Sequence, residues 1–159
     1  MPLNKNLTLS TATACLILLT AIPAMAQDSA HQHKEHAAKE LMLDEGKKWQ
    51  SDAPLRQGMQ SINDAVIDAV PAFHQNKLTK PDAKQLAEHI NKQVQYLVQH
   101  CKLSPQADAV LHVIIADLLG GADELANQPL SMQGLPRIVG ALQQYPKFFE
   151  QPKWRQINH

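Results

Sequence analysis

Apolar residues recur at helical spacing in four successive segments of this chain. In the first segment the steps alternate between four and three positions, as on one face of an α-helix; its members are Leu55, Met59, Ile62, Val66, Ala69 and Phe73. The pattern returns in residues 86–101, 111–125 and 135–145. Because short connections make consecutive helices antiparallel, the sequence predicts an all-α fold, an antiparallel up-down four-helix bundle within residues 51–159.

Local signals predict where these helices begin and end. Asp52, Thr79 and Ser104 can each accept a hydrogen bond from a free amide at a helix start, and a proline follows each of them within two positions. Proline interrupts a helix, so we expect the first helix to kink or end at Pro71 and the fourth to stop at Pro146.

Two further features predict contacts between elements. Gly120 and Gly121 lie inside the third helix, where each glycine costs roughly 1 kcal/mol relative to alanine. Close approach of a neighbouring helix would compensate for that cost. The C-terminal tail carries Phe148, Phe149 and Trp154, and we expect it to fold back over one end of the bundle.

The first 26 residues have the features of a signal peptide. Lys5 precedes an apolar run within residues 7–22, and Ala24-Met25-Ala26 is a typical cleavage sequence. The run is too short to anchor the chain in a bilayer. We therefore predict cleavage after Ala26 and a periplasmic location.

Residues 27–50 are predicted to be a flexible, histidine-containing leader. Within it, residues 41–50 are expected to add a short turn of helix, with Trp49 as its apolar anchor.

Composition excludes several classes of function for the processed chain. Removing residues 1–26 removes one lysine and no acidic residue, so the formal charge becomes about −1. A near-neutral chain without basic clusters is a poor binder of nucleic acid or of anionic membrane surfaces. No later apolar stretch is long enough to cross a membrane, so no integral membrane segment is expected after cleavage. Only Cys101 remains, and one cysteine cannot form an internal disulfide.

The predicted topology brings three potential metal ligands to a similar height in the bundle. At 1.5 Å per residue, Met59, Cys101 and His112 fall within roughly 10 Å of one another along the axis. Thioether, thiolate and imidazole together favour copper, since soft sulfur ligands suit the cuprous ion. The simpler interpretation treats Met59 and Cys101 as core residues and pairs His112 with Asp108 one helical turn earlier.

The leader offers a second set of ligands. His31, His33 and His36 are spaced closely enough to wrap around a cupric, nickel or zinc ion. A solubilising polar tail is the alternative interpretation of this segment.

The segment Leu55-Arg56-Gln57-Gly58-Met59-Gln60 resembles the opening helix of periplasmic b-type and c-prime cytochromes. This resemblance implies a helical bundle in which a methionine can ligate haem. The c-prime class attaches haem through C-x-x-C-H, and the b-type class uses a histidine in its last helix. This chain has neither feature, so haem is not the expected cofactor.

A second resemblance concerns residues around the start of the predicted first helix and around the turn before the third. Trp49, Asp52, Leu55-Arg56 and Met59 together with Cys101-Lys102-Leu103 and Ala107-Asp108 are similar to a group of small exported bacterial proteins of unassigned function. The similarity implies an exported bundle and no particular activity.

We therefore predict a periplasmic metal-binding or metal-responsive protein, with copper favoured and zinc as the other candidate metal. Enzyme activity is not expected, because the chain lacks H-E-x-x-H, G-x-S-x-G and a glycine-rich nucleotide loop. Two alternatives stay open. One is a cofactor-free structural or interaction module that meets an envelope protein or a second copy of this chain, and the other is a haem-binding electron carrier.

Overall fold

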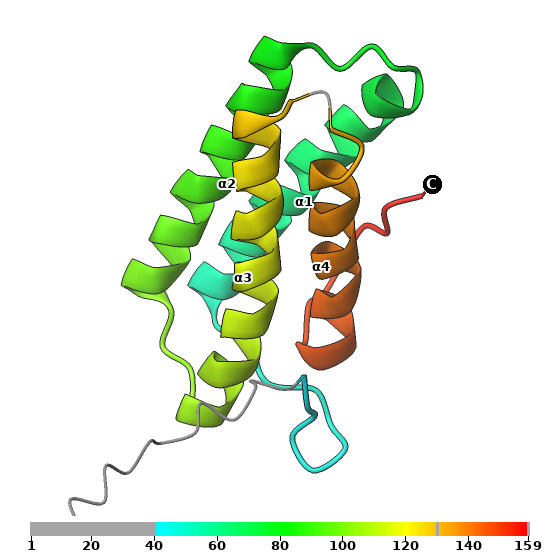
Figure 1. The fold of residues 1–159 in the computed structure, drawn as a ribbon. Coiled ribbons are helices and arrows are strands. Elements are labelled where there is room, and N and C mark those ends of the chain that lie inside the picture. The colour runs from blue at the N-terminus through cyan, green and yellow to red at the C-terminus, as the bar shows by residue number, and fades with distance from the viewer. Residues whose placement is uncertain (1–40, 130, 159) are drawn as a thin grey trace, which may run out of the picture. The chain divides into compact units, whose positions relative to one another are not determined.

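The computed structural model describes residues 41–129 and 131–158, which form four α-helices and no β-strand (Figure 1). These are α1 (Ala53–His74), α2 (Lys80–His100), α3 (Pro105–Asn127) and α4 (Gly134–Phe148). The predicted antiparallel four-helix bundle is confirmed. None of the described helices combines the length and the apolar character that a membrane span requires. The predicted signal peptide and residues 27–40 of the predicted leader lie outside the described residues.

The connections of the bundle divide between its two ends. The α1–α2 and α3–α4 connections lie at one end, and the α2–α3 connection lies at the other end, together with residues 41–52 (Figure 1). Cys101 belongs to the α2–α3 connection and therefore lies at this second end.

The predicted helix caps are confirmed. The Asp52 carboxylate accepts the Leu55 amide at 2.8 Å. Thr79 and Asp82 form a reciprocal capping box at the start of α2, and the Ser104 hydroxyl accepts the Ala107 amide at 3.3 Å. Each cap satisfies a backbone donor that the first helical turn leaves free.

Proline ends neither helix. The expected stop at Pro146 was wrong, and of the two outcomes expected at Pro71, a kink or an end of the helix, the end does not occur. Helix α1 continues through Pro71 to His74, and α4 continues through Pro146 to Phe148. The Gln75 amide donates to the Pro71 carbonyl at 3.2 Å, which extends the hydrogen-bonding pattern beyond the proline. A proline in the last turn removes one amide donor but has a helical φ, so the other backbone hydrogen bonds survive.

Helices α3 and α4 approach each other closely at two glycines. A Cβ placed on Gly121 would lie 2.5 Å from Ile138 Cγ1 and 2.7 Å from the Gly134 carbonyl oxygen. A Cβ on Gly134 would lie 3.0 Å from the Gly121 carbonyl oxygen. The two backbones therefore touch where neither residue has a side chain, and the predicted close approach at the glycine pair is confirmed.

Residues 41–50 contain no helix, contrary to the expected short helical turn. Asp44 and Lys47 instead exchange two backbone hydrogen bonds of 2.8 Å across a tight turn. Both central residues have positive φ, 48° at Glu45 and 83° at Gly46, which is typical of a hairpin turn and incompatible with a helix. Trp49 is buried, as its expected role as an apolar anchor requires.

The C-terminal tail lies against α1 and α4 rather than only covering one end. The Asn63 amide of α1 donates to the Arg155 carbonyl at 2.9 Å. The Trp154 ring lies 5.2 Å from the ring of Tyr145 in α4, and Ile157 is buried. Helices α1 and α4 make fewer direct contacts with each other than the other packed pairs do. The tail therefore supplies contacts that link α1 to α4.

Candidate functional site

Cys101 and His112 line the same pocket, which has a volume of about 210 Å³ and lies between α2 and α3. Cys101 directly follows α2, and His112 lies in the second turn of α3. Val98, one of the lining residues, is 68% exposed. The complete lining is Leu97, Val98, Cys101, Asp108, Leu111, His112 and Ile115. One thiol, one imidazole and one carboxylate thus share a mainly apolar pocket.

The Cys101 thiol is held in its protonated form. Burial raises its pKa to about 12, and the carboxylates of Asp52 and Asp108 add to the shift. Burial disfavours the thiolate because the anion loses hydration, and nearby negative charge repels it. A metal ion would have to displace this proton, although the same two carboxylates would attract a cation to the sulfur.

The imidazole of His112 is oriented by Asp108, one turn earlier in α3. Nδ1 lies 2.8 Å from the Asp108 carbonyl oxygen and 3.3 Å from its carboxylate Oδ2. A carbonyl oxygen can only accept, so Nδ1 carries the hydrogen and Nε2 keeps its lone pair. The side chain is 43% exposed. Metal-ligating histidines are commonly oriented in this way by a carbonyl or carboxylate on the other ring nitrogen.

Met59 lies apart from this pocket. Its side chain is completely buried in the apolar core, and Met59 is not one of the residues that line the pocket. Of the three ligands predicted in the bundle, the structure therefore brings Cys101 and His112 together and leaves Met59 inside. Its environment is that of a core residue.

The three leader histidines, His31, His33 and His36, lie outside the described residues. Within residues 41–129 and 131–158, no three side chains of histidine, cysteine, aspartate or glutamate are grouped so that they could hold a metal ion. The Cys101 pocket therefore contains a thiol and an imidazole that are potential ligands, without a complete group of three.

Sequence reasoning identified Asp52 only as a helix cap. In the structure its Oδ1 accepts the Leu55 amide at 2.8 Å, and its Oδ2 accepts the Lys102 amide at 2.6 Å. One carboxylate thus joins the start of α1 to the residue after Cys101. No local pattern in the sequence predicts a hydrogen bond between residues that are 50 positions apart.

The two histidines of α2, His89 and His100, form contacts outside this pocket. His100 Nδ1 lies 2.9 Å from the Tyr96 carbonyl oxygen, and its ring stacks on Tyr96 at 4.5 Å. His89 Nε2 lies 3.1 Å from the Ser61 hydroxyl in α1. His100 is therefore a suitable control, since it precedes Cys101 in sequence without lining the pocket.

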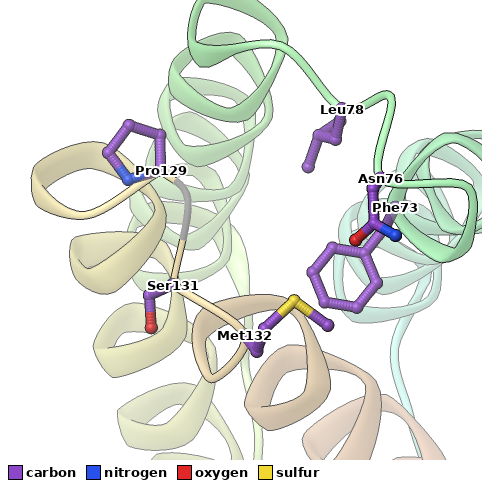
Figure 2. A pocket seen from close by; sticks show the side chains of 6 residues that line it. All are labelled: Phe73, Asn76, Leu78, Pro129, Ser131 and Met132. Carbon is purple, nitrogen blue, oxygen red and sulfur yellow. The ribbon is translucent and has the colours of Figure 1, made fainter.

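Two other hollows have different chemistry. A groove of about 510 Å³ lies between α1 and α2, and its polar side chains are Asp68, Asp82, Gln85 and His89. A smaller pocket of about 80 Å³ lies between the two connections at the opposite end from Cys101, where Figure 2 shows its six side chains. Its lining consists of Phe73, Asn76, Leu78, Pro129, Ser131 and Met132. Neither hollow contains a thiol.

The candidate site thus consists of the Cys101 thiol, the oriented imidazole of His112 and the carboxylates of Asp52 and Asp108 close by. No protein-family model, no curated protein and no solved structure matches this chain.

Proposed function

We propose that this chain is an exported, periplasmic metal-binding protein that holds copper(I) between Cys101 and His112 and has no catalytic role. The observation that carries the proposal is the shared pocket of these two side chains. The orientation of His112 by Asp108 supports it, because Nε2 is left with a lone pair for a metal.

The ligand types favour copper over zinc. Soft sulfur ligands suit copper(I), and imidazole is also an acceptable copper ligand. Structural zinc sites take four protein ligands and catalytic zinc sites three. In the described part of the chain, the thiol, imidazole and carboxylate of this pocket do not form a group of three that could hold one ion. The Asp108 carboxylate contributes negative charge that favours a bound cation.

The proposal keeps a role for the leader. His31, His33 and His36 would take up cupric ion or zinc from solution, where closely spaced imidazoles are effective ligands. The predicted signal peptide supports the periplasmic location. Haem is not proposed, because the chain has no C-x-x-C-H motif and α4 contains no histidine.

The first experiment is an anaerobic copper(I) titration of the processed chain against a coloured competing chelator. We expect one tightly held copper(I) per bundle, and we expect Cys101→Ser and His112→Ala each to weaken it by about tenfold or more. His100→Ala should leave the affinity unchanged, since His100 lies outside the pocket. Absence of uptake at micromolar copper would disprove the proposal.

A second titration separates the leader from the bundle. The triple variant His31→Ala, His33→Ala, His36→Ala should lose uptake of cupric ion and keep the copper(I) site. Loss of copper(I) binding in this variant together with unchanged binding in Cys101→Ser would move the site from the bundle to the leader.

The second candidate function is a cofactor-free module that binds an envelope protein. Met132, which is 62% exposed, borders the pocket in Figure 2 and gives this end of the bundle an apolar contact. Under this alternative, capture of an envelope partner would be lost in Met132→Ser and kept in Cys101→Ser. The opposite result would argue for the metal site.

A further inference from the structure

We infer that Asp52 is a positioning residue for the copper site, because it holds the turn that places Cys101 in the pocket that His112 also lines. The inference rests on the proposed function and deepens it. Asp52 itself lies outside the pocket lining and acts on the metal through Cys101.

The backbone on both sides of the thiol is tied to a helix. The Cys101 amide donates to the Leu97 carbonyl at 2.9 Å, which anchors it to the last turn of α2. The next amide, that of Lys102, donates to Asp52 Oδ2 at 2.6 Å. Cys101 has an extended backbone, with φ −69° and ψ 140°, so these two bonds hold the point where the chain leaves the helix.

Asp52 can hold the turn after Cys101 in place because its own position is fixed. Its Oδ1 caps α1 through the Leu55 amide at 2.8 Å. The preceding residue, Ser51, donates its hydroxyl to the Glu150 carbonyl, and its own carbonyl accepts a hydrogen bond from Arg56. The carboxylate thus connects a rigid helix start to an irregular turn.

The affinity of a metal site with few ligands depends on residues that hold those ligands in place. Two ligands bind one ion tightly only if their separation is already set, and supporting residues that set it typically contribute 10–100-fold in affinity. His112 is fixed by α3 and Asp108, whereas Cys101 lies in the α2–α3 connection. Loss of the Asp52–Lys102 hydrogen bond would therefore increase the mobility of the Cys101 sulfur more than that of the His112 imidazole.

The test compares Asp52→Ser with Thr79→Ala. Asp52→Ser keeps the α1 cap, because serine is also a good N-cap residue, and loses the bond to Lys102. Thr79→Ala removes the cap of α2 at the far end of the bundle. We expect Asp52→Ser to weaken copper(I) binding by about tenfold or more and to reduce the ultraviolet charge-transfer band of the copper–thiolate. Thr79→Ala should lower the melting temperature and leave both readings unchanged.

Asp52→Asn supplies the conservative rescue. The amide keeps one acceptor oxygen and therefore one of the two backbone bonds. Its copper(I) affinity should lie between those of wild type and Asp52→Ser. All titrations are made at a temperature where circular dichroism shows each variant folded.

The outcomes separate the two proposals. Equal copper(I) affinity in wild type, Asp52→Ser and Thr79→Ala overturns the role of Asp52 and leaves the copper site intact. A wild-type chain that takes up no copper(I) overturns the proposed function and the positioning role together.

Discussion

Trp49 and Phe149 pair in a short parallel bridge that joins the segment before α1 to the segment after α4. The Trp49 amide donates to the Phe148 carbonyl at 2.7 Å, and the Glu150 amide donates to the Trp49 carbonyl at 2.9 Å. Both side chains are buried. The last residues before α1 and the first residues after α4 are therefore part of the packed domain and stabilise the end of the bundle that carries Cys101.

The tail should contribute measurably to stability through Ile157. This side chain is buried near the last described residue, beyond the hydrogen bond between Asn63 and the Arg155 carbonyl. Ile157→Ala should lower the free energy of unfolding by about 2 kcal/mol, measured by urea denaturation. The exposed neighbour Gln156 provides the control, since Gln156→Ala should change stability by less than about 0.5 kcal/mol. Equal effects of the two variants would show that the tail is not packed as described.

The contact between α3 and α4 predicts opposite effects at two helical glycines. Gly121→Ala should destabilise the protein by about 1–3 kcal/mol, because the new Cβ would overlap Ile138 and the Gly134 carbonyl. Gly140→Ala should stabilise it by about 0.5–1 kcal/mol, because a Cβ at Gly140 meets nothing within 4 Å and alanine favours a helix. Thermal unfolding of both variants checks the pair, and a stabilising Gly121→Ala would contradict the close approach.

The sequence was sufficient to predict those features of the fold that depend on neighbouring residues. Apolar periodicity and the caps at Asp52, Thr79 and Ser104 predicted the starts of the first three helices, because a cap and the amide it satisfies lie within three residues. Their ends were harder to predict. Pro71 and Pro146 lie in last turns, where the loss of one amide donor does not stop a helix.

The candidate site was predictable only in part. Cys101 lies in a tight connection and His112 lies in the second turn of the helix that follows it, so hairpin geometry keeps them within roughly 10 Å of each other along the axis. The same arithmetic gives a height for Met59 but does not decide whether it faces the pocket or the core. The bond from Asp52 to Lys102 joins residues 50 positions apart through a backbone amide, which leaves no trace in side-chain patterns.

Tyr145 should make the protein sensitive to alkaline pH. Burial raises the pKa of its phenol above the ordinary value of about 10. Above pH 10 the unfolded chain loses this proton and the folded chain keeps it, so stability falls as pH rises, by up to about 1.4 kcal/mol per pH unit. Tyr145→Phe should remove this contribution, whereas Tyr96→Phe should retain it. Urea denaturation of both proteins from pH 8 to 11 measures this difference. An identical pH dependence of stability in wild type and Tyr145→Phe would contradict the raised pKa of Tyr145.

Cys101 should react slowly with alkylating reagents in the metal-free protein. Burial, together with Asp52 and Asp108, raises the pKa of its thiol to about 12, so the reactive thiolate is scarce at pH 8. Iodoacetamide should modify the folded protein more than about tenfold more slowly than the protein in urea. The folded rate should keep rising by about tenfold per pH unit up to pH 10, because this range lies below the raised pKa. A rate that levels off near pH 9 would show an ordinary thiol.

The Asp52→Asn variant should react faster than wild type at pH 8, because it removes one of the negative charges that disfavour the thiolate.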